Sequence, residues 1–249
     1  MNIALVSDRP GWIPPDITHD WDTNPYAYQT EEELIPGGSL HWDLLSHLMI
    51  TPKDFLEKKG LMLLPDSFML FRDSKGIRQR IASDLMLIPF CSSMPDFHDL
   101  DVKPPPSAVI DITSMRNHIN DLENNAPLYM ELGVSAYIVI NAVTPEGLAC
   151  EKTGMHMWRK TNEQISRIQT DAEDYLNVPE MSIRLRASGD RLISLETLES
   201  EILYDTGQLQ QLLKEERLRA EQERQKADIL ATKLRTLGID PDEFADGQK

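Results

Sequence analysis

Two aspartates stand at or inside apolar runs that have the alternation of β-strands. Asp84 opens the run Leu85–Ile88, and Asp111 lies within Ala108–Thr113. Burying a carboxylate is costly unless it is paired, hydrogen-bonded or bound to a metal. Two carboxylates from neighbouring strands can hold Mg²⁺, which prefers oxygen ligands and keeps several waters. Such an ion can bind a phosphodiester oxygen and lower the pKa of an attacking water. These two residues are therefore the candidate metal ligands.

A structural role accounts for the same two residues. Asp84 could begin its strand and bond a turn, while Asp111 could pair with an arginine or a backbone amide. The six histidines form no alternative centre, because His41 and His47 lie six residues apart in a helical pattern and would face different directions. The chain shows no Ser-His-Asp constellation, glycine-rich phosphate loop or dinucleotide fingerprint. The residues alone leave the catalytic and structural interpretations open.

The stretch around Asp111 predicts a strand, a helix and a second strand. Residues 108–113 form the first apolar run. Helical spacing follows, and Gly133 stops it before the second buried run at 136–140. This order indicates a crossover between parallel strands. The helical row consists of Ile119, Leu122, Ala126 and Tyr129.

The flanking segments also predict regular structure. We expect helices at 39–50 and 52–59, with Trp42, Leu45, and Leu48 or Met49 on the apolar row of the first. Strands are expected at 67–71 and 81–88, and the proline-rich stretch 95–106 reads as a loop. Segments 148–158, 164–169, 182–186 and 191–194 predict an antiparallel meander. Residues 1–38 contain five scattered prolines and predict an irregular N-terminal arm.

The net charge of −16 argues against a general polyanion binder, because phosphate binding depends on clustered lysine and arginine. One short stretch is basic and either faces DNA or forms a solvated hairpin. It contains Arg72, Lys75, Arg78 and Arg80. No apolar stretch reaches the roughly 18 residues that span a bilayer. The two cysteines make no disulfide framework, so we expect a cytoplasmic protein that does not bind a membrane.

The C-terminal stretch from Gln208 to Leu237 predicts a charged helix that ends at Gly238. A first heptad row is apolar throughout, and a second row is interrupted by two glutamates. The first row is Leu213, Ala220, Ala227 and Leu234, and the second is Leu209, Glu216, Glu223, Leu230 and Leu237. The helix could form a short coiled coil in a homodimer or remain largely solvated.

Several of these motifs resemble a family of candidate restriction endonucleases that is abundant in cyanobacteria and belongs to the PD-(D/E)XK nuclease superfamily. The resemblance covers roughly residues 39–243. It rests on four stretches: Ala82–Leu87, Ala108–Ser114, Leu128–Ile140 and the charged tail Leu212–Glu243. It implies a Mg²⁺-dependent DNA endonuclease with an α/β fold, in which helices flank a mixed central sheet and a long charged C-terminal helix follows.

The resemblance also implies roles for single residues. Asp84 matches the first metal-binding aspartate, with Ser83 where proline is usual. Asp111 matches a position usually held by glutamate, and Asp121 matches an acidic residue at the start of the helix. Asn125 stands where the catalytic lysine is expected, and it carries no charge to stabilise a developing phosphorane. Because Pro127 would break a helix interior, the helix is expected to begin near Asn125, where asparagine can serve as the N-cap.

Together these observations predict four segments: the arm 1–38, a restriction-endonuclease-like domain at 39–205, the helix 206–238 and a tail at 239–249. Two functions remain open. One is a metal-dependent endonuclease with Asp84, Asp111 and Asp121 in its site. The other is a catalytically degenerate member of the same fold that acts in interaction or assembly, as the uncharged Asn125 and the acidic net charge favour.

Overall fold

The computed structural model describes residues 39–113, 125–143, 149–161, 164–187 and 193–237. The chain divides into two units after Leu203. The predicted arm 1–38, the residues 114–124 with Asp121, and the tail after Leu237 lie outside the described residues. Within the described part, no helix is both long enough and apolar enough to cross a membrane.

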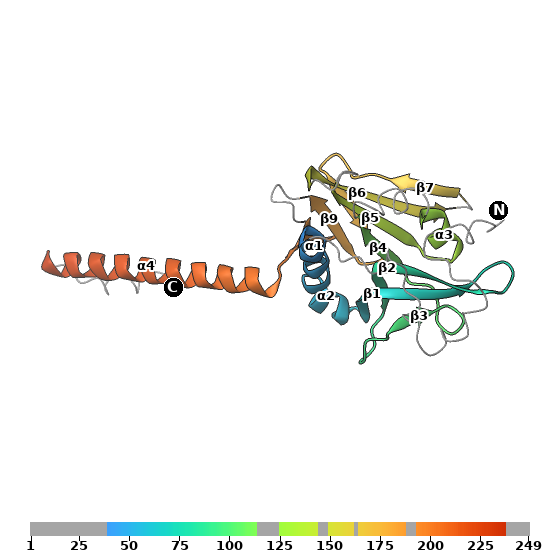
Figure 1. Ribbon diagram of the computed structural model, residues 1–249. Coiled ribbons are helices and arrows are strands. Elements are labelled where there is room, and N and C mark those ends of the chain that lie inside the picture. The colour runs from blue at the N-terminus through green and yellow to red at the C-terminus, as the bar shows by residue number, and fades with distance from the viewer. Residues whose placement is uncertain (1–38, 114–124, 144–148, 162–163, 188–192, 238–249) are drawn as a thin grey trace. The chain divides into compact units, whose positions relative to one another are not determined.

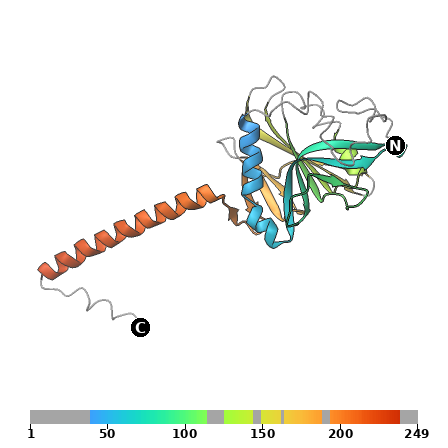
Figure 2. The ribbon, with the colours of Figure 1, turned by 60° about the horizontal axis from the view of Figure 1, so that its bottom comes forward.

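The first unit contains a seven-stranded mixed sheet with the strand order β3-β1-β2-β4-β5-β6-β7 (Figure 1). Its pairs are antiparallel except for β1 with β3 and β4 with β5. The strands are β1 Leu61–Arg72, β2 Arg78–Pro89, β3 Phe97–Asp99, β4 Ala108–Ile112, β5 Ala136–Val143, β6 Ala149–Thr161 and β7 Gln164–Ile168. The β1–β2 hairpin is a long two-stranded ribbon (Figure 2).

Helices cover both faces of this sheet. One face packs on α1 (Ser39–Ile50) and α2 (Lys53–Lys58), and the other packs on α3 (Asn125–Glu131) (Figure 1). All five residues of β4 are buried, because a strand covered on both sides is apolar along its whole length. The parallel pairing of β4 with β5 confirms the predicted strand–helix–strand unit. The predicted α/β fold with a mixed, helix-flanked central sheet is therefore confirmed.

A second, four-stranded antiparallel sheet has the order β11-β10-β9-β8. Its strands are β8 Tyr175–Val178, β9 Ile183–Ala187, β10 Ile193–Thr197 and β11 Ile202–Leu203. One face of this sheet shares a core with α1 and the large sheet. The imidazole of His47 on α1 donates to the carbonyl oxygen of Ile193 at 2.6 Å, which ties the helix to β10.

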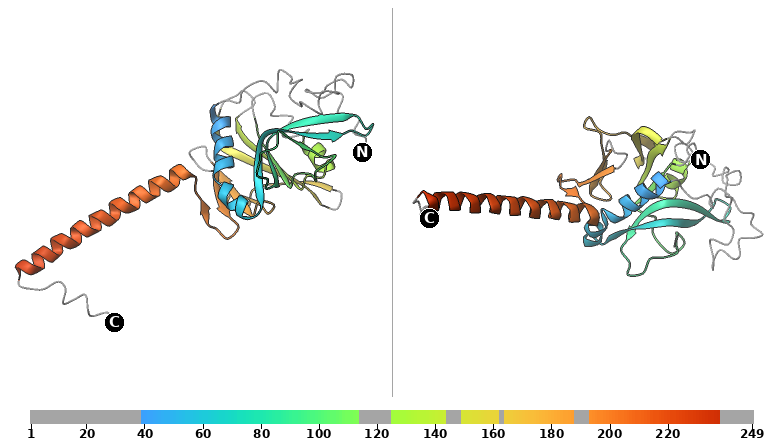
Figure 3. Two further views of the ribbon diagram at one scale, coloured as in Figure 1. Left: turned by 90° about the horizontal axis from the view of Figure 1, so that it is seen from below. Right: turned by 60° about the vertical axis from the view of Figure 1, so that its left-hand side comes forward.

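The long helix α4 (Thr206–Thr236) belongs to the second unit (Figure 3). Asp205 caps it: the carboxylate accepts the amide of Gln208, whose side chain accepts the amide of Asp205 in return. The predicted long charged C-terminal helix is thus confirmed. None of its residues is buried.

Some predictions of local structure were wrong. The expected loop 95–106 contains β3, because three residues pair alongside β1. The expected single meander is split: β6 and β7 extend the large sheet, whereas β9 and β10 belong to the small sheet together with the unpredicted β8 and β11. On α1, Leu45 and Leu48 are buried as predicted, but Trp42 is 46 % exposed and Leu44 is buried in its stead. The true apolar stripe is rotated, which brings His41 to its border.

Candidate functional site

The two predicted aspartates face each other where β2 and β4 part. Their antiparallel ladder runs from Leu87↔Ala108 to Leu85↔Ile110, and the next register position pairs Asp84 with Asp111. At this position, hydrogen bonds from backbone amides to the two carboxylates replace the backbone-to-backbone bonds of the ladder. The amide of Asp84 donates to Asp111 Oδ1 at 3.1 Å, and the amide of Ile112 donates to Asp84 Oδ2 at 2.6 Å. The structure therefore brings the two predicted ligands together.

A third aspartate lies next to this pair. Asp66 interrupts β1 between Pro65↔Leu85 and Ser67↔Ser83, at the register position opposite Asp84. Its φ of 40° is in the left-handed region, which few residues other than glycine adopt. Burial and the charge of Asp84 raise the pKa of Asp66, against a smaller lowering by His41. Acidic side chains thus stand on three adjacent strands.

Asp111 is the most strongly perturbed group of the site. It is 5 % exposed, and the hydroxyl of Tyr137 on β5 donates to its Oδ2 at 2.8 Å. Burial and the charge of Asp84 raise the pKa of Asp111 from 3.8 to about 7, although the bonds from Tyr137 and the Asp84 amide act in the opposite direction. A cation bound nearby would favour the ionised form of this carboxyl group and lower its pKa.

Sequence reasoning missed three residues of the site: Asp66, Tyr137 and His41. The Nε2 of His41 lies 3.3 Å from Asp84 Oδ1, and its side chain is 15 % exposed. Burial lowers the pKa of His41. The net effect is nevertheless a raised pKa, because four interactions outweigh burial: the hydrogen bond to Asp84, the charge of Asp84, the backbone hydrogen bond to Ile112 and the charge of Asp111. The spacing of His41 from Leu44, Leu45 and Leu48 placed it on the buried face and could have revealed it.

Aromatic side chains close the site on the α3 side of the sheet. The ring of Tyr137 lies between Tyr129, at 4.7 Å, and Trp158, at 5.6 Å. The hydroxyl of Tyr129 donates to the carbonyl oxygen of Ala82, two residues before Asp84. This packing fixes the phenol that holds Asp111 and keeps water from that carboxyl group.

The residues expected on the helix are only partly described. Asp121 lies outside the described residues. Asn125 is the first described residue of α3, and the residues before it lie outside the described part, so the expected helix start and N-cap at Asn125 stay predictions. The assignment of the lysine position to Asn125 stays a prediction.

The donor set suits a hard divalent cation that keeps most of its water. Asp84 and Asp111 offer four carboxylate oxygens, each with one protein hydrogen bond and a second lone pair to spare. Among the described residues, no three side chains of histidine, cysteine, aspartate or glutamate are placed to hold a metal ion. A cation would have these two carboxylates as its protein ligands and waters in its other positions, a pattern common for Mg²⁺.

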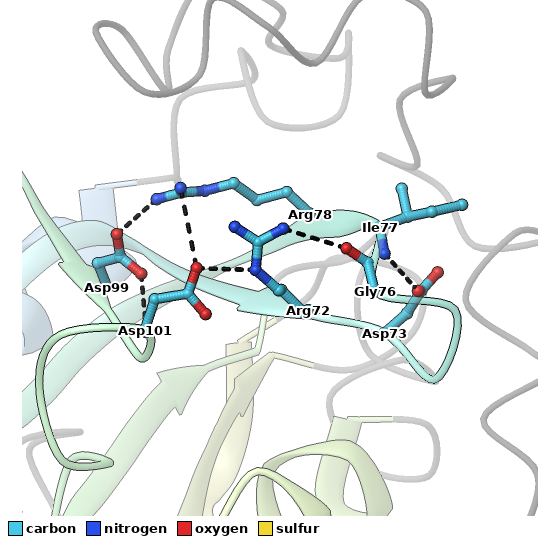
Figure 4. Close-up of polar contacts among 7 residues, drawn as sticks. All are labelled: Arg72, Asp73, Gly76, Ile77, Arg78, Asp99 and Asp101. Carbon is cyan, nitrogen blue, oxygen red and sulfur yellow. Dashed lines mark hydrogen bonds and ion pairs between the residues drawn. The ribbon is translucent and has the colours of Figure 1, made fainter.

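The predicted basic stretch lies at the β1–β2 hairpin, and carboxylates pair with two of its four cations (Figure 4). Arg72 pairs with Asp101 at 2.9 Å, and Arg78 pairs with Asp99 at 2.5 Å. Arg80 is 9 % exposed, and its guanidinium lies 4.3 Å from the centre of the Phe68 ring. Lys75 at the tip is exposed. Two of the arginines of the hairpin thus form ion pairs within the chain. DNA binding at the hairpin stays a prediction.

Comparisons with solved structures add a distant likeness. No protein-family model matches the chain, and no curated protein matches it. The crystal structure of a candidate nuclease of the DUF820 family from Anabaena variabilis aligns with 59 % of this chain and 75 % of its own. The TM-score is 0.42 and the sequence identity is 12 %.

Proposed function

We propose that the Asp84–Asp111 pair is the divalent-cation site of a nuclease, with a DNA phosphodiester as the substrate. The observation that carries the proposal is the buried carboxyl of Asp111, whose pKa is raised to about 7 beside a second carboxylate. Perturbed groups of this kind concentrate at functional sites, where they serve a ligand rather than stability. The motif resemblance supports the same assignment.

In this proposal each described residue has a defined role. Asp84 and Asp111 hold the ion. A bound Mg²⁺ would lower the pKa of an attacking water and offset charge on the phosphodiester. His41 positions Asp84 through the contact at 3.3 Å, and Tyr137 positions Asp111 through its hydroxyl. The uncharged Asn125 predicts slow turnover, because an ammonium group at that position would stabilise the developing charge.

The competing function is a degenerate nuclease fold that acts in interaction or assembly. One observation favours it: every oxygen of Asp84 and Asp111 already has a protein partner within 3.3 Å. In that case the two carboxylates would serve to join β2 and β4 where the backbone ladder ends.

Nicking of supercoiled plasmid separates the two functions. With Mg²⁺ or Mn²⁺ we expect the wild type to produce open circles, and Asp84→Asn/Asp111→Asn to be about 100-fold slower or inactive, as when a group that acts on the transition state is removed. Asp54→Asn, which changes an exposed carboxylate on α2, is the matched control and should nick like the wild type.

Two results would contradict the nuclease. Equal nicking by the double variant would assign the activity to a contaminant, and a wild type inactive with both metals would leave the interaction function. Circular dichroism of each variant establishes that it is folded.

A further inference from the structure

The helix α4 exposes an apolar stripe along its length. No residue of this helix is buried, and its leucines include Leu209 at 46 %, Leu213 at 58 % and Leu230 at 60 % exposure. A helix that presents such a stripe normally packs it against another surface. The two heptad rows place these leucines near both ends and put alanine and glutamate in the middle.

We infer that α4 pairs with α4 of a second copy of this chain, antiparallel, with Leu213 opposite Leu230. In an antiparallel pair, each residue of the first row faces a residue of the second row on the other helix. This register makes four kinds of layer, each of which occurs twice. They are Leu209 with Leu234, Leu213 with Leu230, Glu216 with Ala227, and Ala220 with Glu223.

The self-complementary layers of this register favour a second copy of the chain over another protein as the partner. A two-fold symmetric interface must be complementary to itself, so that a contact from i to j is repeated from j to i. Here every leucine of these layers faces a leucine, and every glutamate faces the small side chain of alanine. The same register places Thr206 opposite Leu237, so the two helices overlap over their full length of 31 residues, about 46 Å.

Charge supports this register as well. Next to the alanines that face the glutamates stand two cations, Arg219 before Ala220 and Lys226 before Ala227. Across the seam, Glu223 therefore lies beside Arg219 of the second copy, and Glu216 lies beside its Lys226. The small alanines leave room for each carboxylate to reach the cation.

The alternative arrangements lack this complementarity. A parallel, in-register pair sets Glu216 against Glu216 and Glu223 against Glu223, which places like charges in the seam. An antiparallel pair shifted by one heptad sets Glu216 against Leu234 and leaves a carboxylate facing an apolar side chain. The glutamates that interrupt the second row thus specify orientation and register.

Disulfide trapping in the full chain tests the orientation. In a Cys91→Ser/Cys150→Ser background, Leu213→Cys and Leu230→Cys are prepared separately, mixed to exchange subunits and then oxidised. We expect a covalent dimer in the mixture and its loss when either variant is oxidised alone. The matched control replaces Leu213→Cys by Leu218→Cys, which changes an equally exposed leucine outside both rows and should give no covalent dimer.

Sedimentation of the untouched wild type provides an independent readout that needs no variant. A dimer that becomes a monomer in Leu213→Glu/Leu230→Glu supports the pairing. A monomeric wild type at micromolar concentration overturns it, and so does a disulfide that forms in Leu213→Cys alone, which would place the helices parallel.

Discussion

Asp111→Asn is expected to stabilise the protein, and to do so by about 2 kcal/mol more at pH 8 than at pH 4.5. The folded protein holds the Asp111 proton up to about pH 7, whereas the unfolded chain releases it near pH 3.8. Folding therefore takes up a proton between these values, and the wild type loses stability as the pH rises through that window.

The size of the expected stability change follows from the pKa shift of Asp111. About three pKa units at about 1.4 kcal/mol each give an upper bound of about 4 kcal/mol, of which the charge of Asp84 accounts for part. Asparagine keeps an oxygen for the Asp84 amide, and its amide group can donate to the Tyr137 hydroxyl. Urea unfolding at both pH values measures the effect, with Asp54→Asn as a control that should show no pH-dependent gain. A variant less stable than the wild type at pH 8 would contradict the claim that the ionised Asp111 carboxylate destabilises the folded protein.

Tyr137→Phe is expected to have the opposite effect, a loss of about 2 kcal/mol at pH 8, because a hydrogen bond to a buried charged group is worth about 1.5–3 kcal/mol. The phenol donates to Asp111 at 2.8 Å, and without it the carboxylate keeps one donor fewer. The loss should shrink at pH 4.5, where Asp111 is protonated in the folded state.

Tyr129→Phe provides the matched control for this change. Its hydroxyl donates to the uncharged carbonyl of Ala82, so its loss should cost about 1 kcal/mol at both pH values. Combining Tyr137→Phe with Asp111→Asn should also reduce the cost of the tyrosine change, as expected for residues in contact. A Tyr137→Phe penalty that is equal at pH 4.5 and pH 8 would show that its hydroxyl does not act through the charge of Asp111.

The centre of the fold could be predicted from the sequence because β4 and residues 136–140 of β5 are buried on both faces. Their apolar runs and the glycine between them identify two strands and a connecting helix whatever lies around them. The pairing of Asp84 with Asp111 could not be derived in the same way. It depends on the antiparallel register of β2 and β4, which the packing of the whole sheet sets.

The role of His41 was missed because Trp42, the larger apolar residue beside it, was expected on the buried face of α1. Trp42 suggested one face, and tertiary packing chose the neighbouring one, with Leu44 inside and Trp42 46 % exposed. A rotation of one residue moves a histidine from the surface to the side of Asp84.

The basic hairpin shows a second limit of sequence reasoning. Arg72 and Arg78 appear as unpaired cations when only their neighbours in the chain are considered. Their partners Asp99 and Asp101 come more than twenty residues later and reach the hairpin because β3 pairs with β1. Short strands such as β3 and β11 carry too few residues for their pattern to stand out.

Calorimetric titration of Mn²⁺ or Mg²⁺ into the protein at pH 8 tests directly whether Asp84 and Asp111 form a cation site. We expect one bound ion per chain for the wild type and for Asp54→Asn, and loss of that binding in Asp84→Asn/Asp111→Asn. Absence of binding to the wild type, or unchanged binding to the double variant, would contradict the claim and leave the two carboxylates as the structural join between β2 and β4.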